Sequence, residues 1–314
     1  MKDPYGNSRR FYVNQVGPMI KEKFGPYEDR IAVGIAGEGS DCFGYDDFIS
    51  RDHDFGTGVC LWISDRDMEI FGNRLKEEYD ELVKRQPGNN LTVRLSQRRG
   101  VMTIHDYYSN ILGIDCDTDN CSLSEMDWRR LDHTCLATAV NGEVFRDDLG
   151  DFSAFRKLLL DYYPDNIWKM HIVNELHKFS ASLQVNYARC MTRGDIVAAR
   201  LCHMQGLEAG MELYFLMKKK YAPYYKWTFR RLSELDDNGR YSSLIKELAM
   251  ENLDYSLWEG QEYRPNILNM DDPIIMLTER IAGCIVAELR KLGFTDSQDP
   301  YLEFYVNTVL DSMN

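Results

Sequence analysis

The amino-acid sequence predicts an α+β protein with two domains: an α/β domain over residues 1–150 and an all-α helical bundle over residues 151–314. Two observations lead to this prediction. In the first half, short apolar runs bounded by glycines and polar turns alternate with stretches whose apolar residues recur at helical spacing. From Asp151 onward, only the helical period continues. A chain of 314 residues can bury one large core or two ordinary ones, which is consistent with this division.

Both kinds of element are expected in the first domain. Apolar residues at helical spacing predict helices over 8–23 and 65–86, the second of which ends at Pro87-Gly88. The acidic and polar stretch 113–130 is expected to be loop and short helix. Short apolar or alternating runs predict strands over 31–36, 53–63, 91–95, 101–105 and 137–145.

The second domain is expected to contain helices only. Asp147–Gly150 is the candidate hinge, and Pro164 ends the first helix. A later helix is expected to end at Lys218, Lys219 and Lys220, because positive charge interacts favourably with the carbonyl end of the helix dipole. Apolar stripes predict the remaining helices near 167–183, 196–216, 227–232, 244–257, 274–292 and 301–310.

Composition narrows the class of partner and the cellular location. A net charge of −13 argues against nucleic acid as the main partner, because phosphate backbones require a basic surface. No apolar run is long enough to predict a membrane helix, and the N-terminal residues lack the apolar core of a secretion signal. The eight cysteines are scattered through the chain, which is typical of reduced thiols in a cytoplasmic protein.

One stretch of the first domain carries the features of a phosphate and metal site. The run 31–36 leads into Gly39-Ser40, where backbone N–H groups and a hydroxyl can bind phosphates. Asp52 and Asp54 then open the next apolar run. In a strand these two side chains project from one face, and paired carboxylates suit Mg²⁺. The alternative is that the two acidic residues only cap a turn.

These residues resemble the signature of the nucleotidyltransferase superfamily, which includes DNA polymerase β and the aminoglycoside nucleotidyltransferases. The signature is a strand, Gly-Ser, a short spacer and Asp-x-Asp at the start of a strand. The longer string Gly-Glu-Gly-Ser-Asp-Cys-Phe-Gly-Tyr-Asp-Asp-Phe-Ile-Ser-Arg-Asp-His-Asp over 37–54 is similar to an uncharacterised bacterial branch of the superfamily. Pro-Tyr-Tyr-Lys-Trp over 223–227 belongs to the same resemblance.

The resemblance implies a small mixed-sheet catalytic domain followed by a helical partner. It implies that Asp52 and Asp54 hold one or two Mg²⁺ ions and that Gly39 and Ser40 bind the terminal phosphates of ATP or another nucleoside triphosphate. Many members add a third carboxylate on a later strand, and in this chain Met102 stands where that residue is expected.

Asp106, at the end of the run 101–105, and Glu143, on a later strand candidate, are the alternatives for the third carboxylate. The sequence does not choose between them, and each also fits an ordinary surface position.

The helical domain offers cations for a triphosphate. In the functional interpretation Lys226, Arg189 and Arg193 neutralise phosphate charge, and a nearby tyrosine or tryptophan stacks on the base. In the structural interpretation Arg193 belongs to a helix start, Lys226 is solvated, and Tyr225 and Trp227 are core residues, which their helical spacing favours.

The expected activity is transfer of a nucleoside monophosphate, AMP from ATP by default, to an acceptor on a small molecule or a protein. A catalytically weak or inactive nucleotide-binding module, with a regulatory or interaction role, is the alternative, and a scaffold role is a third. Zinc is not expected at Cys116, Cys121, His133 and Cys135, because their spacing differs from that of structural zinc sites.

Overall fold

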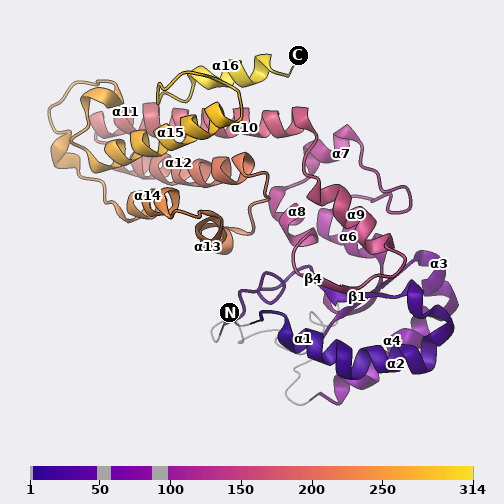
Figure 1. The fold of residues 1–314 in the computed structure, drawn as a ribbon. Helices are drawn as coiled ribbons and strands as arrows, with labels where there is room; N and C mark the ends of the chain where they lie inside the picture. The colour runs from indigo at the N-terminus through magenta and orange to yellow at the C-terminus, as the bar shows by residue number, and fades with distance from the viewer. Residues whose placement is uncertain (1–2, 48–57, 87–97, 314) are drawn as a thin grey trace. The chain divides into compact units, whose positions relative to one another are not determined.

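The computed structural model describes residues 3–47, 58–86 and 98–313, which form two compact units, Met1–Tyr162 and Tyr163–Asn314 (Figure 1). The first unit contains a sheet and helices, and the regular structure described in the second is helical. The α+β class expected from the sequence is therefore confirmed. The boundary falls later than residue 150, because helix α9 (Asp151–Leu160) belongs to the first unit.

A four-stranded mixed sheet lies at the centre of the first unit, with the strand order β3-β2-β1-β4. β1 pairs antiparallel with both β2 and β4, and β2 pairs parallel with β3. The four strands are β1 (Ala32–Ile35), β2 (Cys60–Ile63), β3 (Gly100–Thr103) and β4 (Glu143–Arg146).

Both faces of the sheet are covered, which explains why β1 and β2 are continuous apolar runs rather than alternating ones. Leu61 and Ile63 belong to a core shared with the N-terminal helices and α4. Trp62 points to the other face, where its ring stacks on Phe152 of α9 at 3.8 Å and meets Tyr107 edge-on at 5.4 Å. Alternate residues of one short strand thus bind two helical layers to the sheet.

The helices of the first unit agree in part with the sequence. The segment expected over 8–23 is helical from Gly6 to Phe24, and the segment expected over 65–86 is helical from Asp65 to Lys84, each with a π-helical turn inside it. The bounds are α1 (Gly6–Phe11), η1 (Tyr12–Val16), α2 (Gly17–Phe24), η2 (Gly25–Arg30), α3 (Asp65–Asp67), η4 (Met68–Gly72), α4 (Asn73–Lys84), α6 (Ile104–Leu112), α7 (Glu125–Arg130), α8 (His133–Ala139) and α9.

The predictions of two strands were partly wrong. The run 101–105 leaves the sheet at Thr103, whose side chain accepts a hydrogen bond from the Asp106 N–H at 2.9 Å and so begins α6. The run 137–145 begins inside α8, which Asp132 caps through the Thr134 N–H, and only Glu143–Arg146 forms a strand. The candidate strand 91–95 lies outside the described residues.

The regular structure described in the second unit consists of helices (Figure 1), and α12 packs against both α10 and α15. Buried side chains fasten them together: the Trp168 indole donates to the Leu216 carbonyl at 2.8 Å, and the Tyr241 hydroxyl donates to the Gly210 carbonyl at 2.7 Å. The bounds are α10 (Asp165–Phe179), η5 (Ser180–Asn186), α11 (Tyr187–Thr192), α12 (Ile196–Met217), α13 (Tyr225–Leu235), α14 (Arg240–Met250), η6 (Tyr255–Leu257), η7 (Asn266–Leu268), α15 (Pro273–Lys291) and α16 (Phe304–Asp311).

The expected helices of this unit are confirmed, with shifted ends. Among the described residues, no helix is both long and hydrophobic enough to cross a lipid bilayer.

Candidate functional site

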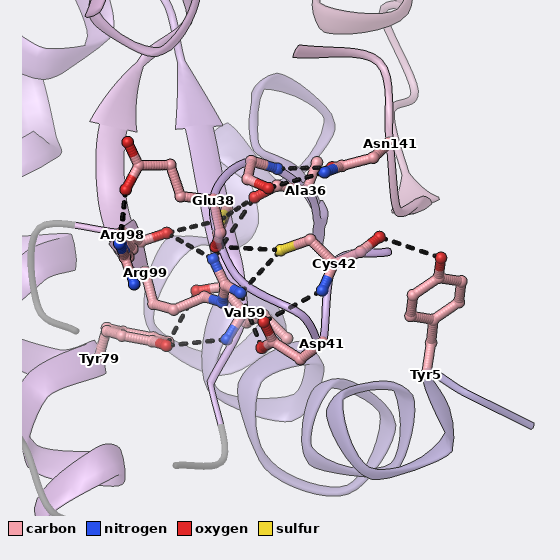
Figure 2. A network of polar contacts seen from close by, with 12 residues as sticks. Tyr5, Ala36, Glu38, Asp41, Cys42, Val59, Tyr79, Arg98, Arg99 and Asn141 are labelled. Atoms are coloured by element: carbon pink, nitrogen blue, oxygen red, sulfur yellow. Dashed lines mark hydrogen bonds and ion pairs between the residues drawn. The ribbon is translucent and has the colours of Figure 1, made fainter. Parts of the chain in front are cut away.

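The candidate site is the edge of the sheet at which β1 ends. The register places Gly34 beside Cys60 and Ile35 beside Glu143, and it places Cys60 beside Gly100. Because β1 runs opposite to its neighbours, its end lies at the same edge as the starts of β2, β3 and β4. The segment that follows β1 is the Gly37–Ser40 turn, and Figure 2 shows how its neighbours hold it.

The Gly37–Ser40 turn requires its two glycines. Gly37 has φ +101° and Gly39 has φ +121°, values that residues other than glycine rarely adopt. A Cβ on Gly39 would also lie 2.4 Å from an Asp41 carboxylate oxygen. The Tyr45 N–H donates to the Ser40 carbonyl at 2.8 Å, which closes the loop after the turn. The backbone conformation therefore explains why both of these positions in the Gly-x-Gly-Ser string are glycine.

Asn141 holds the turn from the side of β4. Its Nδ2 donates to the Gly37 carbonyl at 2.7 Å, and its Oδ1 accepts from the Gly37 N–H at 2.8 Å. The next residue, Gly142, has φ +70°, and a Cβ there would lie 1.9 Å from the Ile35 carbonyl oxygen. The Asn141-Gly142 corner can therefore approach the end of β1 only because Gly142 has no side chain.

Arg99 holds the turn from the side of β3. Its side chain is only 6% exposed. Nη2 donates to an Asp41 carboxylate oxygen at 2.8 Å and to the Cys42 sulfur at 2.8 Å. Nη1 donates to the Arg98 carbonyl at 2.8 Å and to the Ala36 carbonyl at 3.4 Å. One buried guanidinium thus joins both ends of the turn to the start of β3.

The Cys42 and Cys60 thiols beside Arg99 are not activated as nucleophiles. Burial raises the pKa of Cys42 well above its ordinary value and also raises the pKa of Cys60, while the Arg99 charge opposes both effects. The nucleophilic form of cysteine is the thiolate. These two cysteines therefore act as neutral, buried packing groups under the turn.

Two further contacts frame the edge. The Tyr79 hydroxyl donates to the Val59 carbonyl at 2.9 Å and accepts from the Val59 N–H at 3.0 Å, which fixes the residue just before β2. Burial raises the Tyr79 pKa, so this hydroxyl stays protonated at neutral pH. Arg98, next to Arg99, donates from Nε to Glu38 Oε2 at 2.8 Å, and Glu38 is the second residue of the turn.

The predicted residues differ in how far the structure describes them. Gly39 and Ser40 lie in the turn at the end of β1. Asp52 and Asp54 lie outside the described residues. Met102 is a half-buried residue of β3.

Asp106 is not at a strand end as expected: it is exposed in the first turn of α6, since Thr103 begins that helix. Glu143 starts β4 at the edge of the turn, where its carboxylate pairs with Arg9 at 2.5 Å. Glu143 and the turn are thus at one edge of the sheet, and Asp106 is elsewhere on the unit.

The predicted cations of the helical domain lie in the second unit. The Arg189 guanidinium lies 5.6 Å from the centre of the Tyr263 ring, and Arg193 is exposed just after α11. Lys226 Nζ lies 5.0 Å from the centre of the Trp227 ring. Tyr225 was expected in the core but is 76% exposed, because it begins α13 on its outer face.

The donor set for a metal is incomplete in the part of the chain that the structure describes. Those residues contain no group of three or more histidine, cysteine, aspartate or glutamate side chains arranged to hold a metal ion. Asp52 and Asp54, the expected Mg²⁺ ligands, are outside that part. Their type and spacing fit Mg²⁺, which prefers carboxylate oxygens.

Sequence reasoning missed the residues that support the turn. Arg98, Arg99 and Asn141 were not among the expected site residues. The Asn141-Gly142 pair is a turn signal, and the two arginines directly precede the glycine that opens β3, but neither pattern indicates a contact with residues 37–42.

Comparison with known proteins adds one match. Residues 128–228 match the family described as "Domain of unknown function (DUF4037)". No curated protein matches the chain, and no solved structure does either. The matched stretch is shorter than half of the chain. It contains Asn141, Glu143, Arg189, Arg193 and Lys226, and it excludes the Gly37–Ser40 turn.

Proposed function

We propose that this protein is a Mg²⁺-dependent nucleotidyltransferase, with a nucleoside triphosphate as donor and a small molecule or a protein as acceptor. ATP is the default donor because of its abundance. The observation that carries the proposal is the chemistry of the Gly37–Ser40 turn. Within the described chain, the backbone N–H groups of Glu38, Gly39 and Ser40 and the Ser40 hydroxyl make no hydrogen bond.

These groups provide donors for an anion. Consecutive free N–H groups in a glycine-rich turn form a concave anion site, and phosphate oxygens accept such bonds strongly. The turn is also preorganised, because Asn141 and Arg99 fix it from two sides. A fixed set of donors binds an anion without first losing conformational entropy.

Besides the nucleoside triphosphate, the proposed reaction needs an acceptor and Mg²⁺. The acceptor hydroxyl gives its proton to a base or to solvent and its oxygen forms a bond to the α-phosphorus, while the bond from that phosphorus to its bridging oxygen breaks and pyrophosphate leaves. Asp52 and Asp54 would hold the Mg²⁺, which neutralises phosphate charge and acts as a Lewis acid. The turn would bind the terminal phosphates. The phosphate-binding roles of Lys226, Arg189 and Arg193 stay predictions from the sequence.

The third carboxylate of the superfamily pattern stays a prediction for Glu143 or Asp106. Glu143 has the more suitable location, at the edge of the sheet where the turn lies. Its ion pair with Arg9 would have to open before it could act as a base.

One observation favours the alternative of a nucleotide-binding module with little or no turnover. Met102 pairs with Trp62 in the parallel β2–β3 ladder, so an apolar side chain stands on the strand where the resemblance places an acid. A module of this kind would bind the nucleotide through the same turn and would release no pyrophosphate.

Calorimetric titration of ATP, CTP, GTP and UTP, with and without Mg²⁺, tests the binding step. We expect Mg²⁺-dependent binding to the wild type that Asp54→Ala weakens by at least about tenfold, or about 1.4 kcal/mol. The matched control is Asp29→Ala, since Asp29 is an exposed acidic residue of the same unit. Removal of Mg²⁺ with a chelator should weaken wild-type binding to the level of Asp54→Ala.

Pyrophosphate release with candidate acceptors then separates the enzyme from the module. Asp52→Asn should abolish release while leaving the circular dichroism spectrum unchanged. Full activity of Asp52→Asn would contradict the metal assignment, and nucleotide binding by the wild type without release would favour the module.

A further inference from the structure

The second unit contains a cavity that the proposed nucleotidyl transfer does not use. Its volume is about 220 Å³, and residues of α12, α14, α15 and the turn before α14 line it. The three helices contact one another in the second unit (Figure 1). Pockets for drug-sized ligands have about 300–1,000 Å³, so this cavity suits a molecule much smaller than a nucleoside triphosphate.

One side of the cavity carries two lysines on a single carboxylate. Lys291 Nζ lies 2.6 Å from one oxygen of Glu288, and Lys218 Nζ lies 3.4 Å from the other. Burial raises the pKa of Glu288, but the two lysines outweigh burial and lower it overall, so this carboxyl group is ionised. Two positive charges thus face one negative charge, and one positive charge remains for a ligand.

Arg240 and Asp237 line the same cavity with opposite charges. Within the described chain, neither the Arg240 guanidinium nor the Asp237 carboxylate makes a hydrogen bond or an ion pair. The Arg240 charge acts inside the cavity, because it opposes the rise that burial causes in the pKa of Cys284 on α15. Arg240 is also the first residue of α14, where a positive side chain gains nothing from the helix dipole. Helix stability therefore does not explain this arginine.

The remaining carboxylate of the cavity serves the fold. Asp236 is buried, and its Oδ2 accepts from the Ser242 N–H at 2.8 Å, which caps the first turn of α14. The side chains of the cavity that are left for a ligand are therefore Arg240, Asp237 and the two lysines.

We propose that this cavity binds a free α-amino acid with an acidic side chain. The α-carboxylate pairs with the Arg240 guanidinium, whose planar fork suits a carboxylate. The α-ammonium group pairs with Asp237, and the side-chain carboxylate takes the remaining positive charge of Lys218 and Lys291. A simple anion would leave Asp237 without a partner, whereas a zwitterion neutralises both unpaired groups. The inference concerns the second unit alone and does not depend on the proposed nucleotidyl transfer.

The test is an NMR titration of the isotope-labelled full-length protein with L-glutamate and with three analogues that each lack one charged group. Glutarate lacks the ammonium group, γ-aminobutyrate lacks the α-carboxylate, and L-glutamine lacks the side-chain charge. We expect L-glutamate to bind with a dissociation constant of about 1 mM or below, and each analogue to bind at least about threefold more weakly. The backbone signals of residues 236–240 should shift on binding, which locates the ligand.

Two substitutions assign the contacts to the ligand's groups. Arg240→Gln should weaken L-glutamate binding by about tenfold, because a charge-assisted, bidentate contact is lost. Asp237→Asn should weaken L-glutamate binding by about three- to fivefold. The same variant should bind glutarate within about twofold of the wild type, since glutarate has no ammonium group to lose a partner.

Lys246→Gln is the matched control, because Lys246 is an exposed cation of α14 that does not line the cavity. It should leave the affinity for L-glutamate within about twofold of the wild type. Thermal unfolding of each variant shows whether the fold is intact. The competing explanation is a surface hollow whose charges are only solvated. Three results would establish it and overturn the proposal: no binding of L-glutamate by the wild type, equal affinities for L-glutamate and glutarate, or an unchanged affinity in Arg240→Gln.

Discussion

At the scale of single residues, Arg99 is the side chain that holds the Gly37–Ser40 turn in place. Its four acceptors come from both ends of the turn and from the start of β3. Buried carbonyl groups that lose a donor cost free energy, and the Asp41 carboxylate, 38% exposed, loses its ion-pair partner. The turn, rather than the sheet, should therefore be the part most sensitive to loss of this guanidinium.

Arg99→Met tests this dependence. We expect the free energy of unfolding to fall by about 2 kcal/mol or more, because acceptors remain unpaired in a buried place. Arg66→Met, at an exposed arginine of α3, should change it by less than about 0.5 kcal/mol. Arg99→Lys should recover only part of the loss, since lysine keeps the charge without the planar fork. Denaturant unfolding measures all three, and equal stability of Arg99→Met and Arg66→Met would contradict the assignment.

The glycines and Ser40 of the site could be predicted from the sequence, and their supports could not. Gly39 and Ser40 belong to a local string whose spacing already suggests a phosphate turn. Arg99 meets that turn only because β3 lies beside β2, and a strand's partner is set by tertiary packing. Nothing in the residues around Arg99 indicates which distant loop it contacts.

At the scale of elements, the errors at strand ends have one cause. Short apolar runs fit a strand or a helix equally well, so the boundary depends on capping residues. Thr103-x-x-Asp106 is a helix-start signature, and the Asp106 N–H does bond to the Thr103 hydroxyl. Asp132 marks the start of α8 in a similar way. These two caps end the strand at Thr103 and place Ala137 in a helix.

The long helix α12 offers a sharp packing prediction at Gly206. A Cβ there would lie 2.2 Å from Leu183 Cγ and 2.9 Å from the Ser182 hydroxyl oxygen, so the helices could not keep their spacing. We expect Gly206→Ala to destabilise the protein by about 1–3 kcal/mol through overpacking. Thermal or denaturant unfolding measures the change.

Gly283 in α15 is the matched control, because a Cβ there would have no atom within 4 Å. Gly283→Ala should stabilise the protein by about 0.5–1 kcal/mol, since alanine loses less backbone entropy in a helix. The prediction about Gly206 fails if both substitutions shift stability in the same direction.

At the scale of the whole molecule, the class of the fold was more predictable than its topology. The change to helical period marks where strands end, and that part of the prediction was confirmed. The same period does not say what a helix packs against. Phe152 of α9 stacks on Trp62 of β2, and its carbonyl accepts from the Tyr108 hydroxyl at 3.1 Å, so α9 belongs to the first unit.

The response of the whole molecule to pH includes a contribution from one half-buried carboxyl group. Burial raises the pKa of Glu279, although hydrogen bonds from Asn266 and Gln184 oppose the shift. A carboxyl group whose folded-state pKa is raised stabilises the fold below its unfolded-state pKa. That contribution is lost as the pH rises through the raised value, because the folded state then releases a proton from a desolvated group.

Glu279→Gln should remove this part of the pH dependence, because the amide resembles the protonated acid. We expect the stability of the variant, relative to the wild type, to increase as the pH rises from about 4 to about 8. Denaturant unfolding at several pH values measures the free energy of unfolding of both proteins. Taking the difference between variant and wild type removes the charge repulsion that both share at a net charge near −13. Glu259→Gln, at an exposed glutamate of the same unit, is the control for the loss of one acidic side chain. A flat difference for Glu279→Gln would mean that this carboxyl group ionises as it does in the unfolded chain.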